Sequence, residues 1–192
     1  MKKLTQTQTQ RQRGLTLIEL LVSLAVAAIV ATLAVPSFRS VIENNRITTI
    51  NDKMLASLRL ARSEAIARGR SVTVCPSNDQ TTCSGTWSDG WILFVDEDGD
   101  RVLDGGTDEV VKANDMTASD YGITLISGIA TSFKYDNEGR AEEQGTFRVC
   151  GPSGESSRAR GIVIQLSGST RYAVDSDADT VREAHEGTNF SC

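Results

Sequence analysis

Apolar residues are concentrated in one run near the start of the chain. Leu15–Val35 contains a single charged side chain, Glu19. A helix of that length measures roughly 30 Å, which is the thickness of the hydrocarbon core of a bilayer. The preceding residues, 1–14, contain no acid, and their basic residues are Lys2, Lys3, Arg11 and Arg13. The pattern predicts a short basic leader and then a hydrophobic helix that lies in a membrane or in a protein bundle.

The pattern after Pro36 becomes that of an amphipathic helix over residues 36–69. Apolar residues recur there at three- and four-residue steps, namely Phe38, Val41, Ile42, Ile50, Met54, Leu58, Ala61 and Ala65. Such spacing predicts one apolar stripe that packs on a sheet. Gly69 suits the C-terminal cap. Pro36 is expected to end or kink the helix where the apolar run stops.

Residues 70–192 show the two-residue alternation of short β-strands. The predicted strands are Ser71–Cys75, Trp91–Asp96, Glu109–Lys112, Ile123–Ile126, Thr131–Tyr135, Thr146–Cys150, Gly161–Leu166 and Thr170–Val174. Few connections are long enough for a crossover helix, so we expect a mainly antiparallel sheet. The predicted fold class is α+β, with one long N-terminal helix packed on a β-rich head.

The charge is −5 overall, but removal of residues 1–14 leaves 16 basic residues against 25 acidic ones, a net charge of −9. An acidic chain is a poor candidate for binding nucleic acid or anionic lipid through its overall field. A local basic patch stays open as an alternative.

Four cysteines, Cys75, Cys83, Cys150 and Cys192, allow three disulfide connectivities. Export would place them in an oxidising compartment, where disulfides persist. We favour Cys75–Cys83 closing a polar loop and Cys150–Cys192 tying down the C-terminus, with free buried thiols as the alternative. A zinc site is disfavoured because His185 is the only histidine and the cysteine spacing does not suit zinc.

Three interpretations of the N-terminal run compete. The run is too long for a secretory signal peptide, and Thr32-Leu33-Ala34 is a poor cleavage site. A simple membrane anchor leaves Glu19 unexplained, because a carboxylate in lipid is costly and usually has a partner. Residues 13–21, which read RGLTLIELL, resemble the type IV prepilin signature.

This resemblance implies processing at the start of the hydrophobic helix. A prepilin peptidase would cut between Gly14 and Leu15, and Leu15 would carry the new, methylated amino terminus. Glu19 would lie one helical turn from that cation, or would meet the amino terminus of a neighbouring subunit and set its register. A proline at the depth of Pro36 is common in the family.

A second resemblance covers most of the remaining chain. Residues 58–68, LRLARSEAIAR, are similar to a segment of the H-type pseudopilins (GspH) of type II secretion and of FimT/FimU-like minor pilins, and so are Val72–Ser77 and Gly90–Asp96. The resemblance implies a type IV pilin fold and a minor subunit that helps to initiate or cap a type IV pilus or a type II secretion pseudopilus. Its partners would be prepilin peptidase, other minor pilins or pseudopilins, and the major subunit. It would sit in the inner membrane with its head in the periplasm, and then near the filament tip.

The alternative function is a pilus-tip DNA receptor for natural transformation. DNA-binding FimT members resemble one another in a Gly-Arg-x-Arg motif on the final hairpin, where this chain reads Gly168-Ser169-Thr170-Arg171. Arg171 matches, and Arg158 and Arg160 precede the hairpin, so these three arginines are the candidate DNA contacts. One missing phosphate contact and the acidic head argue against this function.

Other candidate chemistry is weak. Asp96, Asp98 and Asp100 resemble a calcium loop. The EF-hand order is not met, because Thr107 stands at the twelfth position, so an acidic turn is favoured. No phosphate-binding loop, metalloprotease motif or catalytic triad spacing occurs, so we expect neither an enzyme nor a cofactor. Trp87 and Trp91 are expected in the core or at a subunit contact rather than in a ligand platform.

Overall fold

The computed structural model describes residues 16–116, 120–126, 129 and 131–192, with the side chains of residues 33–37 left out. The chain divides into two compact units, an N-terminal unit, Met1–Val41, and a C-terminal unit, Ile42–Cys192. The long helix α1 comprises Leu17–Arg68. It runs through Pro36, so of the two expected effects of this proline the end of the helix does not occur, and the hydrophobic and amphipathic segments form one helix. Proline removes the hydrogen bond that its own amide would donate, and a long helix can lose that single bond and still continue.

The end of α1 follows the predicted cap. Gly69 has a φ of +63°, a left-handed conformation that glycine adopts without a steric penalty. The amide of Arg70 donates to the carbonyl of Ala65 at 3.3 Å, which is the long hydrogen bond of a Schellman motif. Arg68 in the last turn pairs with Glu64 and with Glu109, each at 2.7 Å. The cap and these ion pairs fix the point where the chain leaves the helix.

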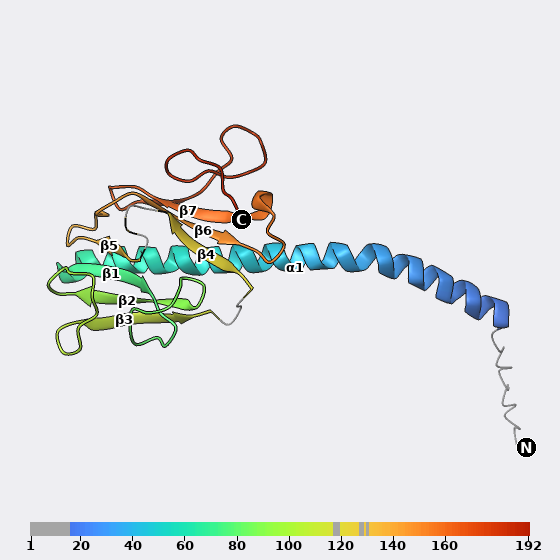
Figure 1. Cartoon of the computed structure of the whole chain (residues 1–192), viewed down its shortest axis with the longest axis horizontal. Helices are drawn as coiled ribbons and strands as arrows, with labels where there is room; N and C mark the ends of the chain where they lie inside the picture. The colour runs from blue at the N-terminus through green and yellow to red at the C-terminus, as the bar shows by residue number, and fades with distance from the viewer. Residues whose placement is uncertain (1–15, 117–119, 127–128, 130) are drawn as a thin grey trace, which may run out of the picture. The chain divides into compact units, whose positions relative to one another are not determined.

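Two four-stranded sheets follow, rather than a single sheet (Figure 1). Their strands are β1 (Ser71–Pro76), β2 (Gly90–Asp96), β3 (Glu109–Asp115), β4 (Gly122–Ile126), β5 (Phe133–Tyr135), β6 (Gly145–Cys150), β7 (Arg160–Ile164) and β8 (Thr170–Tyr172). The first sheet has the order β3-β2-β1-β5 and the second the order β4-β6-β7-β8. Every strand pair is antiparallel. Each predicted strand is present, and the α+β fold class is confirmed.

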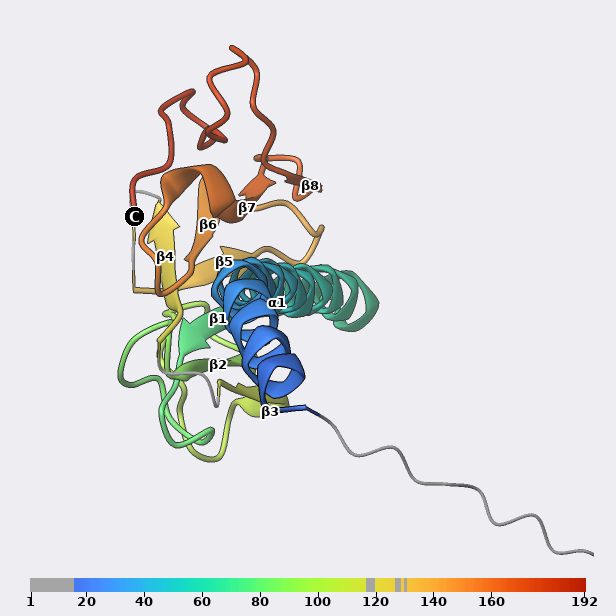
Figure 2. The same cartoon turned by 90° about the vertical axis from the view of Figure 1, so that its right-hand side faces the viewer.

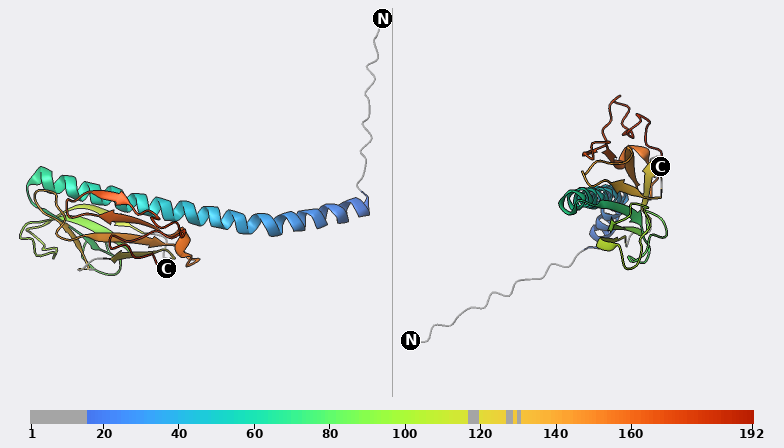
Figure 3. Two further views of the ribbon diagram at one scale, coloured as in Figure 1. Left: turned by 90° about the horizontal axis from the view of Figure 1, so that it is seen from above. Right: turned by 90° about the vertical axis from the view of Figure 1, so that its left-hand side faces the viewer.

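Figures 1 and 3 show α1 lying along the strands of the C-terminal unit. One hydrophobic core joins this part of the helix to both sheets. The helix contributes fully buried side chains such as Ile47, Met54 and Leu58. The strands contribute alternate residues of their inner faces, including Trp91 from β2 and Phe147 from β6. The apolar stripe of the helix and the two-residue period of the strands therefore meet as predicted.

The stripe is shorter than the sequence predicts. Phe38, Val41 and Ile42 are 68%, 52% and 58% exposed, whereas burial begins at Ile47. Glu43 accepts hydrogen bonds from the amide and the hydroxyl of Ser153, so the edge of the β-rich region lies at this turn of the helix. The apolar pattern of α1 therefore begins several residues before the part of the helix that the strands cover.

The outer face of the second sheet has a smaller core of its own. Ala159, Val163, Ala173, Ala184 and Phe190 are buried together there. The chain after β8 runs across this face and ends beside it (Figure 2). A Cβ atom at Gly161 would lie 2.4 Å from the ring of Phe190, so the approach of the C-terminal segment requires glycine at this position.

Both tryptophans belong to the main core. The indole of Trp91 is fully buried and donates to the Ser57 hydroxyl at 2.9 Å. Trp87 meets Phe147 edge-to-face, with ring centroids 4.8 Å apart. Burial of both rings excludes an exposed ligand platform and confirms their expected place in the core.

Candidate functional site

The start of α1 is organised by a reciprocal hydrogen-bonded pair. Thr16 precedes the first helical residue, and its hydroxyl accepts the Glu19 amide at 3.3 Å. The carboxylate of Glu19 accepts the amide of Thr16 at 3.3 Å and its hydroxyl at 3.2 Å. This is a capping box, which satisfies amide groups that a helix leaves unpaired at its start. Glu19 therefore has a structural partner besides the amino terminus that the sequence suggested.

The capping box could have been found from sequence, because Thr-x-x-Glu before an apolar run is its signature. Gly14 and Leu15, the residues of the expected cleavage site, lie outside the described residues. Pro36 lies within α1, but its side chain is also outside them.

The first turns of α1 present apolar side chains on all faces. Nine of them between Leu17 and Val30 are 49–78% exposed. Large exposed apolar surfaces usually mark a site that another protein or a lipid covers. Among the described residues, no helix carries an apolar stretch that is long enough to span a membrane.

All four cysteines are paired in the described part of the chain, and the pairings are those that the sequence favours. Cys75–Cys83 links residues eight positions apart, and Cys150–Cys192 links residues 42 positions apart. Asp79 organises the first loop by accepting the amides of Thr81 and Thr82 and the hydroxyl of Thr82. These hydrogen bonds hold the pKa of Asp79 well below its ordinary value.

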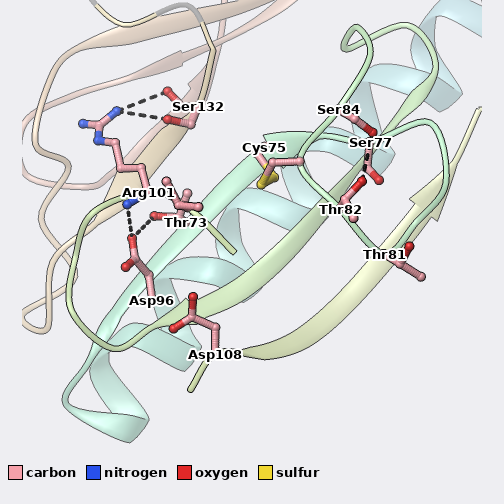
Figure 4. The surroundings of a disulfide bond; sticks show 12 residues. Thr73, Cys75, Ser77, Thr81, Thr82, Ser84, Asp96, Arg101, Asp108 and Ser132 are labelled. Carbon is pink, nitrogen blue, oxygen red and sulfur yellow. Dashed lines mark hydrogen bonds between the residues drawn. A yellow bond between two sulfur atoms is a disulfide. The ribbon is translucent and has the colours of Figure 1, made fainter. Parts of the chain in front are cut away.

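The acidic loop after β2 is held by protein donors. Asp96 is fully buried and accepts the amide of Gly99 at 2.7 Å. It also accepts the hydroxyl of Thr73 at 2.7 Å and the amide of Arg101 at 3.1 Å (Figure 4). Asp96, Asp98 and Asp100 do bring carboxylate oxygens together, and so do Asp175, Asp177 and Asp179 near the C-terminus, a group that the sequence analysis missed. Because Asp96 is engaged by three donors, the first group has the geometry of an acidic turn.

A second network links this loop to the following strands. The side chain of Arg101 is 14% exposed and lies 3.4 Å from a Glu143 carboxylate oxygen. Lys134 pairs with Glu142 at 2.6 Å and donates to the carbonyl of Gly99, also at 2.6 Å. Figure 4 shows the guanidinium of Arg101 directed at Ser132. These contacts hold the β2–β3 loop against the connection between β5 and β6.

The three candidate DNA contacts do not form one free basic patch. Arg158 pairs with Glu155 at 2.6 Å and with Glu43 at 3.4 Å. Arg160 is partly buried and donates to backbone carbonyls of its own segment. Arg171 is exposed on β8. Arg158 is paired with carboxylates, so the three arginines do not form the open basic patch that the alternative of a DNA receptor would use.

Two arginines of α1 lie beside the β7–β8 turn instead. Arg62 donates to the carbonyls of Gly139 and Ser167 at 2.9 and 3.0 Å, and Arg59 lines the same hollow. Gly168 in this turn has a φ of +77°, and a Cβ there would lie 1.9 Å from the Gly139 carbonyl oxygen. No local pattern reveals this contact, since Arg62 and Ser167 are 105 residues apart.

His185 is held by a single threonine. Its Nδ1 lies 3.1 Å from the Thr146 hydroxyl, and its amide donates to the same oxygen at 2.8 Å. The disulfides remove the cysteine thiols as nucleophiles. The geometry around this histidine is that of a structural contact in the C-terminal segment.

Two family models match the chain. The family described as type II transport protein GspH matches residues 51–168, and the prokaryotic N-terminal methylation motif matches residues 9–35. No curated protein sequence matches significantly.

The type IV minor pilin FimU of Pseudomonas aeruginosa matches in structure. One crystal form has a TM-score of 0.52 at 19% identity and covers 67% of this chain and 89% of FimU. A second crystal form has a TM-score of 0.48 at 18% identity, covering 66% and 92%. Identity this low establishes the fold alone, and the first match confirms the type IV pilin fold. Since the GspH model covers more than half of its residues, the chain belongs to the GspH family of type IV pilin-like proteins.

Proposed function

We propose that this chain is a minor subunit that helps to initiate or cap a type IV pilus or a type II secretion pseudopilus. It is made as a precursor with leader residues 1–14, and it acts by assembly rather than by catalysis. Its partners are prepilin peptidase, other minor pilins or pseudopilins, and the major subunit.

The observation that carries this proposal is an exposed hydrophobic helix inside a methylation motif. The motif spans residues 9–35, and its described apolar side chains from Leu17 to Val30 are about half to three-quarters exposed. Such a surface needs lipid or other apolar helices around it. A subunit that waits in the inner membrane and then moves into a filament core would meet both requirements in turn.

Processing would add a charge beside the capping box. A cut between Gly14 and Leu15 creates an ammonium group one residue before Thr16. The positive end of the helix dipole disfavours that cation, and a carboxylate in the first turn offsets the effect. Glu19, which already reaches the Thr16 amide, is placed to pair with the new terminus of its own chain or of a neighbour.

The rest of the chain would lie outside the cytoplasm. Two disulfides suit an oxidising compartment such as the periplasm. The similarity of fold to FimU, a minor pilin by its description, favours a subunit of low abundance.

Deletion of the gene tests this proposal. We expect most surface filaments, or most type II secretion, to be lost, and the wild-type gene to restore them. The chain should be present in sheared filaments at far lower abundance than the major subunit. Unchanged assembly and secretion in the deletion strain, with no chain in the filament fraction, would contradict the proposal.

A further inference from the structure

A hollow of about 520 Å³ lies between α1, the β7–β8 hairpin and the segment that follows β8. All of its residues belong to the C-terminal unit. Its polar lining comes from Thr48, Asn51, Asp52, Arg160, Tyr172, Asp175 and Arg182. This size is typical of sites that enclose a small molecule or a few protein side chains.

Two arginines converge in the hollow. Arg160 and Arg182 both donate to the carbonyl of Ala159, at 3.3 and 3.2 Å, which holds their guanidinium groups next to each other. Burial and the neighbouring charge of Arg182 lower the pKa of Arg160. In the part of the chain that the structure describes, none of the ion pairs involves Arg160 or Arg182. Two adjacent cations of this kind favour an anion between them.

Asn51 gives a second, independent indication that a ligand binds in this hollow. The residue lines the hollow and is 2% exposed, and its buried carboxamide oxygen has no hydrogen-bond donor among the described residues. A buried acceptor that has no donor is costly, so native proteins rarely leave one unpaired. A ligand that donates a hydrogen bond here would remove that cost.

The acidic residues of the lining already have donors. Asp52 accepts the hydroxyl of Tyr172 at 2.9 Å. Asp175 accepts the amides of Ala178 and Thr180 at 2.7 and 2.9 Å. Within the described ranges neither aspartate forms an ion pair with Arg160 or Arg182, so the hollow lacks a carboxylate bound at the arginines and a hydrogen-bond donor at Asn51.

We propose that this hollow binds an acidic residue of another polypeptide. Its carboxylate would bridge Arg160 and Arg182, and a backbone amide of the same segment would donate to the Asn51 carboxamide oxygen. An aspartate or glutamate in a loop carries both groups at a short separation, which matches the two needs of the site. This inference goes beyond the proposed function, since it assigns a binding site in the C-terminal unit. It can be tested on isolated chains, without filaments.

The test uses the full chain in detergent micelles with ¹⁵N labelling, observed through the arginine Nε–Hε signals. The probe is aspartate blocked as its N-acetyl N-methylamide, and blocked asparagine is the uncharged control. We expect blocked aspartate alone to shift the signals of Arg160 and Arg182. Arg160→Gln and Arg182→Gln should each weaken binding by about tenfold, because a bidentate charged contact is lost. Asn51→Leu should weaken it severalfold.

Arg171→Gln, an exposed cation outside the hollow, is the matched control and should leave binding unchanged. Glutamine keeps a donor for the Ala159 carbonyl, and the amide spectrum of each variant checks its fold. If an arginine variant unfolds, Asn51→Leu and the comparison of aspartate with asparagine still decide the result. Equal shifts with blocked asparagine, or no shift with blocked aspartate, would overturn the proposal. Binding of inorganic phosphate without blocked aspartate would overturn it in favour of a free anion.

Discussion

Replacing Glu19 by alanine is expected to lower incorporation of the chain into filaments by more than about a hundredfold. The proposed filament core is apolar, and removal of one partner from a buried ion pair costs about 3–5 kcal/mol. The measurement is the ratio of this chain in sheared filaments to the chain in whole cells, by quantitative immunoblot. The C-terminal unit should keep its fold, because Glu19 lies in the N-terminal unit.

Two further variants separate the charge of Glu19 from its capping role. Glu19→Gln keeps a side-chain acceptor for the Thr16 amide but removes the charge. Thr16→Ala keeps the charge but removes half of the capping box, at a cost of about 0.5–2 kcal/mol. We expect Glu19→Gln to lower incorporation into filaments almost as much as Glu19→Ala does. Thr16→Ala should lower it only slightly. Normal incorporation of Glu19→Gln would mean that capping, and not an ion pair, is the contribution of this residue.

Removing the Cys150–Cys192 disulfide is expected to destabilise the C-terminal unit by about 4 kcal/mol. The bond closes a loop of 42 residues, and the entropy that a crosslink removes from the unfolded chain grows with loop length. The bond also fastens the C-terminal segment over the small core around Phe190. A loss of this size lowers the Tm of a unit of about 150 residues by roughly 12 °C.

The other disulfide provides the matched comparison. Cys75–Cys83 closes a loop of only eight residues, so Cys75→Ala with Cys83→Ala should cost about 2.5 kcal/mol. Thermal unfolding of both double-alanine variants, followed by circular dichroism, measures the difference. If removal of Cys75–Cys83 lowered the stability more than removal of Cys150–Cys192, local packing rather than loop closure would dominate the contribution of these disulfides.

The helix and the strands can be predicted from the sequence, because the residue patterns that indicate them are local. Gly69 is placed as a cap by the end of a helical pattern, and β2 is recognised from a run of β-favouring residues. The partners of the strands carry no such signal. β5 lies between β4 and β6 in the chain, yet it pairs with β1, and this pairing separates two sheets where one was expected.

The candidate sites show the same limit. Glu155, one partner of Arg158, is three residues before it, but the other partner, Glu43, is 115 residues away and has no local signal. The convergence of Arg160 and Arg182 on one carbonyl likewise depends on how the C-terminal segment folds back. The capping box of Thr16 and Glu19 is different, since its Thr-x-x-Glu signature is local and was visible in the sequence.

Mass spectrometry of the amino-terminal peptide tests the central claim most directly. The chain would be purified from cells that contain prepilin peptidase and from cells that lack it. We expect the first sample to begin at a methylated Leu15 and the second to retain the residues before it. A chain that keeps residues 1–14 in both samples would contradict the account.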